Sequence, residues 1–143
     1  MVSCCWPLWV CLEKSGSYVA RTQFEELEVY QLAEKLADLV WRIVSVWDQF
    51  PQNTLGKQLG RTSDSIGANI AEGCGRGSFK DNQRFVKIAR GSLYETKHWL
   101  RRAFRRRLLN TAETDELKKL LDELSPRLNA YLNSIGRVNP TDN

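Results

Sequence analysis

The sequence predicts an all-α protein folded as an antiparallel up-down-up-down four-helix bundle. Apolar residues recur every three or four positions through four long segments, which is the period of a helix with one buried face. The connections between these segments are short, as in bundles whose neighbouring helices run in opposite directions. No segment shows the every-second-residue alternation of a half-buried strand.

The first helix is expected over Phe24–Phe50. Pro51 should end it, because the proline ring clashes with the preceding helical turn. The predicted buried stripe comprises Val29, Leu32, Leu36, Leu39, Ile43, Val46 and Phe50, widened by Ala33, Val40 and Trp47.

The second helix is expected over Thr54–Glu72 and is rich in small residues. Its core positions are Leu55, Leu59, Ile66 and Ile70, with Thr62 or Ser63 filling the gap between them. Glycine destabilises a helix by up to about 1 kcal/mol relative to alanine, so several glycines require a reason. Close approach of a neighbouring helix is the reason we expect for Gly56, Gly60, Ser63, Gly67 and Ala71.

The third helix should begin after Ser78, a good N-cap with Asp81 in the capping-box position, and extend to about Leu109, closed by Asn110 and Thr111. Its core stripe is Phe85, Ile88, Ala89, Ser92, Thr96, Trp99, Leu100 and Ala103.

The fourth helix is expected over Ala112–Ile135, with a kink at Pro126 and an end at Gly136. Its inward positions are Leu117, Leu120, Leu121, Leu124, Leu128, Tyr131, Leu132 and Ile135. The bundle therefore occupies residues 24–136, followed by a tail over 137–143.

The charge is distributed unevenly along the chain. The net charge of +4 is modest. Residues 51–110 nevertheless carry thirteen Lys and Arg against four Asp and Glu, whereas both flanking regions are mildly acidic. A basic block of this kind indicates an anionic partner.

Residues 1–23 form an N-terminal extension whose first twelve residues are apolar. This run has no basic start and no small-residue cleavage site, and it is far shorter than the roughly 20 residues that span a bilayer. We therefore expect no membrane association, and a flexible tail, an upstream mis-start and a partner-docking segment remain open. The cysteines show neither a zinc-site pattern nor a disulfide framework, which favours a reducing cytoplasm.

Catalysis is the function that the sequence supports least. His98 is the only histidine, and no nucleophile pairs with it in the sequence. A di-iron site in a bundle needs Glu-x-x-His pairs, which the chain lacks. The glycines Gly73, Gly75 and Gly77 follow no strand, so they indicate a loop and not a dinucleotide site. We expect no enzyme activity, no metal and no cofactor.

The strongest candidate site is a basic face on the third helix. Lys80, Arg84, Lys87, Gly91, Tyr94, His98, Arg101 and Arg105 recur at intervals of three or four, so they share one side. Arg90 and the neighbouring Arg102, Arg106 and Arg107 add further charge. The alternative is an ordinary solvated face whose cations suit a helix C-terminus. Arginine density and interleaved aromatic residues favour a phosphate-binding surface.

The run Ser65-Ile66-Gly67-Ala68-Asn69-Ile70-Ala71-Glu72-Gly73-Cys74-Gly75-Arg76 resembles the core motif of a bacterial family. These are four-helix bundles first met as proteins encoded by intervening sequences in 23S ribosomal RNA genes. A second match follows in Phe85 and the run Ile88-Ala89-Arg90-Gly91-Ser92-Leu93-Tyr94-Glu95, and the similarity covers about residues 24–135.

The resemblance implies a homopentamer without known enzyme activity. One branch of the family, the accessory variability determinant of diversity-generating retroelements, is similar in architecture and basicity. Its members bind the reverse transcriptase and template RNA of the element. We therefore expect an oligomeric accessory protein that binds RNA or DNA and a reverse transcriptase. A structural or protein-interaction bundle without a nucleic-acid role is the alternative.

The motif residues also have an expected structural role. Glu72 lies in the last turn of its helix, where the dipole disfavours a carboxylate, so we expect it to pair with Arg76 or Arg84. Asn69 should face the bundle and form a hydrogen bond across helices. Gly73, Ser92 and Glu95 complete the motif set. Exposed Trp41 and Trp47, together with the small-residue ridges, suggest a second buried face in an oligomer.

Overall fold

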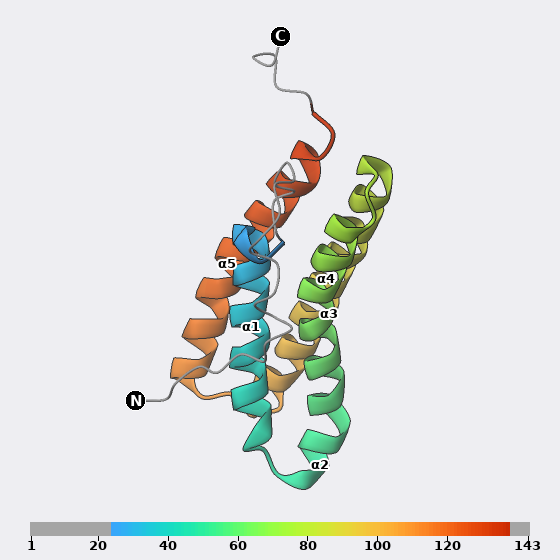
Figure 1. The fold of residues 1–143 in the computed structure, drawn as a ribbon. Helices are drawn as coiled ribbons and strands as arrows, with labels where there is room; N and C mark the ends of the chain where they lie inside the picture. Colours follow the sequence, from blue (N-terminus) through green and yellow to red (C-terminus); the bar gives the residue numbers. More distant parts are fainter. Residues whose placement is uncertain (1–23, 138–143) are drawn as a thin grey trace, which may run out of the picture.

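The computed structural model describes residues 24–137 and shows a four-helix bundle without strands in that range (Figure 1). After a 3-10 turn at Phe24–Glu26 come α1 (Glu28–Ser45), the short α2 (Gln49–Pro51), a π-helical turn (Gln52–Gly56), α3 (Lys57–Gly75), α4 (Phe79–Arg105) and α5 (Thr111–Ser134). The predicted segments 1–23 and 138–143 lie outside the described residues.

Each long helix packs against two others. α3 contacts α4 most extensively and also α1, while α5 contacts both α1 and α4. Figure 1 shows α1 beside α5, with α3 and α4 forming the other half of the bundle. The helices α1 and α4 are therefore at opposite corners, so their outer faces point in different directions.

The core follows the predicted stripes, with differences at the helix ends. Leu36, Leu59, Ile66, Ile70, Leu124 and Leu128 are the largest fully buried apolar side chains. The prediction that Thr62 or Ser63 fills the gap in the α3 stripe is confirmed, because both are about 1% exposed. Ile88 was expected inside but is 45% exposed, whereas Val86 and Leu93 are buried. The buried stripe of α4 is therefore rotated away from the side on which Ile88 lies.

The expectation that Pro51 ends the first helix is wrong. α1 ends at Ser45, where the Gln52 side-chain amide donates to the carbonyl oxygens of Val44 and Ser45 at 3.1 Å each. Gln52 thereby satisfies the Ser45 carbonyl and adds a second hydrogen bond to the Val44 carbonyl, which also accepts from the Trp47 N–H at 3.1 Å. Pro51 lies in the first turn of that element, where a missing N–H is tolerated.

Because α1 ends early, the apolar residues predicted at its C-terminal end differ from the prediction in their exposure. Val46 and Phe50, both predicted in the core, are each 79% exposed. Trp47, which we placed both at the margin of the buried stripe and on a second face for an oligomer, is partly buried against the core. Trp41 is 71% exposed, as expected. An apolar surface therefore remains on the outside of α1 and of the turn that follows it.

The ends of α4 and α5 differ from the prediction at one connection. Ser78 caps α4 by accepting a hydrogen bond from the Asp81 N–H at 3.1 Å, as predicted. α4 ends at Arg105, not near Leu109. Asn110 does not close α4; it begins α5, with a capping box to Glu113. α5 continues through Pro126 and is followed by Gly136 at φ +79°.

Close approach explains only part of the glycine pattern. A Cβ on Gly56 would lie 2.7 Å from Val44 Cγ1, and one on Gly73 would lie 2.6 Å from Asn82 Oδ1. Gly56 lets α1 pack directly against the backbone of the π-helical turn, and Gly73 does the same for α4 against α3. A Cβ on Gly60 would meet no atom within 4 Å, so packing among residues 24–137 does not require a glycine there.

Candidate nucleic-acid interface

The outer face of α4 carries the predicted row of cations. Lys80, Arg84, Lys87, His98, Arg101, Arg102 and Arg105 are all exposed. They lie on one long helix, which rises about 1.5 Å per residue, so the row extends for nearly the whole length of the bundle. Gly91 and Tyr94 lie within it, and Tyr94 is 61% exposed.

Few carboxylates neutralise this row. Within residues 24–137, Arg84 forms the one ion pair that involves it, with Asp81 at 3.7 Å. Both side chains are largely exposed, and a surface pair of this kind contributes little stability. The remaining cations of the row repel one another without a compensating partner among the described residues. An unpaired row of cations favours an anionic ligand.

Three of the predicted basic residues lie off this row. Arg90 is half-buried and donates to Asn129 Oδ1 of α5 at 3.4 Å, so it braces the bundle. Arg106 borders a surface groove beside Trp99. Arg107 follows the helix end, and its backbone is left-handed with φ 58°.

The α4 C-terminus is closed by backbone hydrogen bonds. The Leu108 N–H donates to the Ala103 carbonyl and the Arg107 N–H to the Phe104 carbonyl, each at 3.0 Å. This is the Schellman arrangement, in which glycine usually occupies the left-handed position that Arg107 holds here. A non-glycine residue in this conformation stores strain, and such strain occurs at functional sites.

The motif residue Asn69 does not form the predicted hydrogen bond across helices. Its amide nitrogen donates within α3, to the carbonyl oxygen of Ser65 at 2.7 Å and to its Oγ at 3.0 Å. The contact between helices comes from Ser92 of α4, whose hydroxyl donates to Ser65 Oγ at 3.1 Å. Ser65, which we did not single out, therefore joins the two motif segments.

Glu72 forms an ion pair with Arg76, one of the two partners expected for it. Each side chain is 47% exposed, so the pair is at the surface and not buried. The Arg76 and Arg84 guanidinium groups each lie 4.8 Å from the centre of the Phe85 ring. Phe85 thereby joins the α3–α4 loop to the start of the basic row through cation–π contacts.

Gly73 belongs to a tight cluster where α3, α4 and α5 meet. Asn82, against which Gly73 packs, donates from its amide to the Tyr131 hydroxyl at 3.4 Å. The same hydroxyl lies 3.5 Å from Cys74 Sγ. Burial raises the pKa of Tyr131 to about 12, an effect that the Asn82 hydrogen bond opposes and Cys74 reinforces. The close packing of Asn82 against Gly73 explains why a glycine occupies this motif position.

Glu95 holds the aromatic residue at the edge of the basic row. Its Oε1 accepts from the Arg61 guanidinium at 3.0 Å and from the Trp99 indole N–H at 3.3 Å. The His98 ring lies edge-on to Trp99, with 4.9 Å between the ring centres. The Trp99 ring is therefore contacted by Glu95 at its N–H and by the His98 ring.

Three carboxylates lie on the α1 side of the bundle, away from the basic row. Glu34 and Asp38 are exposed on α1, and Asp64 is exposed on the neighbouring α3. Burial, followed by repulsion from Asp38, raises the pKa of Asp64. Because α1 and α4 are at opposite corners, the α1 carboxylates and the basic row lie on different sides of the molecule.

Other kinds of site find little support. Among residues 24–137, no three His, Cys, Asp or Glu side chains gather as metal ligands would. None of the described helices is long and apolar enough to cross a membrane.

Comparison with known proteins identifies the family. The family model for the 23S rRNA-intervening sequence protein matches residues 25–130. The chain belongs to this family. The match includes both motif segments, residues 65–76 and 85–95. The family membership predicted from these segments is therefore confirmed. No protein with a curated description matches it significantly in sequence.

A solved structure supports the family fold. It is a protein of unknown function from the S23 ribosomal protein family of Bacteroides thetaiotaomicron VPI-5482. The two chains are 22% identical and superpose with a TM-score of 0.65, over 74% of this chain and 99% of that one. At this identity the likeness establishes the shared fold and nothing about ligands.

Sequence reasoning missed the groove beside Trp99 and the π-helical turn that borders it. Trp99 was assigned to the core and Arg106 to the basic face, and no sequence pattern linked them to residues 53–58. The concentration of Thr, Gln, Asn and Lys in that segment was the one available signal.

Proposed function

We propose that this protein is a non-enzymatic nucleic-acid-binding accessory protein of the cytoplasm. The observation that carries the proposal is the row of seven exposed basic and histidine side chains on α4, with one carboxylate contact among the described residues. Lys and Arg rows of this kind bind phosphates and displace condensed counterions. A rigid helix positions such contacts well and reads sequence poorly, so we expect slight sequence preference.

The partner follows from the family resemblance. A basic bundle of this family is similar to the accessory variability determinant of diversity-generating retroelements. We therefore propose that the ligand is structured template RNA and that a reverse transcriptase is the protein partner. A reverse transcriptase gene and a variable repeat beside the gene for this protein would support the assignment.

We also propose that antiparallel bundles assemble into a homopentamer. Two features of the structure support assembly: Trp41 is 71% exposed, and Gly60 has open space where a side chain would lie. A ring would repeat the basic row and raise apparent affinity even when each site is weak. Sedimentation equilibrium should give a mass near five times 16.5 kDa. A monomer at micromolar concentration would remove the pentamer.

The binding proposal is tested with two charge variants of equal net charge. Arg101, Arg102 and Arg105 are changed to Gln in the first variant. The control changes Lys35, Lys118 and Lys119 to Gln, which removes three exposed cations from α1 and α5. Glutamine keeps helix propensity while it removes charge. Fluorescence anisotropy with structured RNA should show a large loss of affinity in the first variant and a small loss in the control.

A second candidate function is protein interaction without nucleic acid. It is favoured by the exposed apolar side chains of Trp41, Val46 and Phe50. Equal RNA affinity of the two charge variants, or no binding of wild-type protein to RNA or DNA at low salt, would favour this alternative. The basic row would then be a solvated face or a docking site for an acidic protein.

A further inference from the structure

A surface groove separates the π-helical turn from the C-terminal half of α4. It consists of two adjoining hollows of about 360 and 440 Å³, both bordered by Thr54, Leu55 and Arg106. Trp99 lines the first hollow and Phe50 the second. These volumes are within the range of small-molecule sites. The groove thus has an aromatic residue toward each end and an arginine between them.

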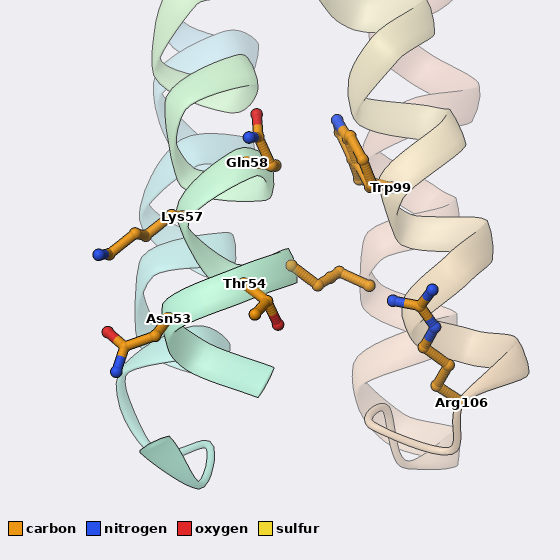
Figure 2. A pocket seen from close by; sticks show the side chains of 7 residues that line it. Asn53, Thr54, Lys57, Gln58, Trp99 and Arg106 are labelled. Atoms are coloured by element: carbon orange, nitrogen blue, oxygen red, sulfur yellow. The ribbon is translucent and has the colours of Figure 1, made fainter. Parts of the chain in front are cut away.

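Figure 2 shows how the side chains lie in the first hollow. Trp99 of α4 and Arg106, which directly follows α4, lie across the gap from Gln58 and Thr54. Asn53 and Lys57 point away from that gap. Trp99 and Arg106 are seven residues apart, so they lie on one side of α4 two turns from each other. The groove therefore combines an aromatic surface, a cation and hydrogen-bonding side chains.

Two backbone irregularities border this groove. On one wall the chain forms a π-helical turn, in which the Lys57 N–H donates to the Gln52 carbonyl. On the other, Arg107 adopts its left-handed conformation directly after Arg106. π-helical turns and strained residues both concentrate at functional sites. They arise from different elements, so they are independent indications of a function at the same place.

The chemistry of the lining indicates the ligand. No acidic side chain lines either hollow in the described part of the chain. Arg102 lies three residues after Trp99 and four before Arg106, so the groove continues from the basic row. Proteins hold unpaired bases by stacking them on aromatic side chains, while cationic side chains contact the phosphates between those bases. The two aromatic ends of the groove and the arginine between them match this arrangement.

We propose that this groove holds unpaired nucleotides of the bound strand. One base stacks on Trp99, the phosphate that follows contacts Arg106, and the next base stacks on Phe50. The amide nitrogen of Gln58 donates to the base edge, whereas its Oε1 accepts from Arg61 at 3.1 Å and the Thr54 hydroxyl donates to the Phe50 carbonyl oxygen at 2.8 Å. The inference rests on the proposed nucleic-acid function and adds to it a preference for single-stranded over fully paired RNA. Every base has a stacking face, so the preference among bases is small.

The test compares labelled single-stranded oligouridylate with a fully paired RNA duplex in anisotropy titrations. Phe50→Ser removes the platform that is 79% exposed, where little packing is lost. Trp99→Leu removes the other platform, and Trp99→Phe keeps an aromatic ring as the rescue. The matched control is Phe79→Ser, which deletes a 71% exposed phenylalanine at the start of α4, at the other end of the helix from the groove. Circular dichroism verifies that each variant retains its helices.

Removal of an aromatic side chain on which one base stacks weakens binding by about 1–3 kcal/mol, which is about 5-fold to 140-fold in affinity. Phe50→Ser and Trp99→Leu should each weaken oligouridylate binding within that range and leave duplex binding unchanged. Trp99→Phe should recover most of the affinity, and Phe79→Ser should match wild type.

The inference is overturned if Phe50→Ser and Trp99→Leu bind oligouridylate as wild type does while the Arg101, Arg102 and Arg105 variant binds weakly. In that case the basic row binds nucleic acid and the groove does not. Equal losses for single-stranded and duplex RNA overturn it as well. If Trp99→Leu loses helicity, Phe50→Ser alone decides. Absence of all RNA binding by wild-type protein instead removes the proposed function itself.

Discussion

Alanine at two glycines of α3 separates packing from helix propensity. A Cβ on Gly73 would lie 2.6 Å from Asn82 Oδ1 and 3.2 Å from both the Asn82 carbonyl oxygen and Phe85 Cβ. A Cβ on Gly60 would meet no atom within 4 Å. Both substitutions gain up to about 1 kcal/mol of helix propensity. The difference between the two variants therefore isolates the steric conflict at Gly73.

Overpacking of this kind costs about 1–3 kcal/mol, so Gly73→Ala should be less stable than Gly60→Ala by that amount. At the size of this domain each kcal/mol moves the melting temperature by about 4 °C. Urea denaturation followed by far-UV circular dichroism measures both variants. Equal midpoints would refute the close approach of α4 to α3 at Gly73. Destabilisation by Gly60→Ala, with loss of assembly, would show that another copy covers Gly60.

Three further predictions concern stability. Arg107→Gly should raise the unfolding free energy by about 1 kcal/mol in urea titrations, because glycine tolerates φ 58° without strain; a loss of stability would contradict this. Glu72→Ala should lower the unfolding free energy by less than about 1 kcal/mol, since Glu72 and Arg76 are each 47% exposed, and a loss above about 2 kcal/mol would contradict a solvent-screened pair. Because folding raises the pKa of Tyr131 from 10.0 to about 12, the neutral phenol contributes to the unfolding free energy. That contribution is complete below pH 10 and is lost as the pH rises toward 12. Tyr131→Phe should abolish that part of the decline in alkaline melting curves, and an unchanged decline would exclude it.

The sequence predicted helix faces better than helix ends. The α3 stripe of Leu59, Ile66 and Ile70 follows directly from residue spacing, because any helix that buries one face must show it. The end of α1 does not, since its last carbonyls are capped by Gln52 from the following turn. Spacing continued the stripe to Phe50, although the helix had already ended.

The candidate site shows the same division. The row on α4 is local, so its period alone placed Lys80, Lys87 and Arg105 on one exposed face. The groove joins Trp99 and Arg106 to a π-helical turn some 45 residues earlier, and no local pattern reports such a contact. The hydrogen bond between Ser92 and Ser65 was missed for that reason also.

The salt dependence of RNA binding tests the central claim most directly. If Arg101, Arg102 and Arg105 each contact a phosphate, log K against log salt should be steep. Changing the three to Gln should make the slope shallower by about 2 to 3 per chain, at about 0.7 to 0.9 per contact. The control without Lys35, Lys118 and Lys119 should keep the wild-type slope. A slope that the α4 substitutions leave unchanged would contradict phosphate binding by this face.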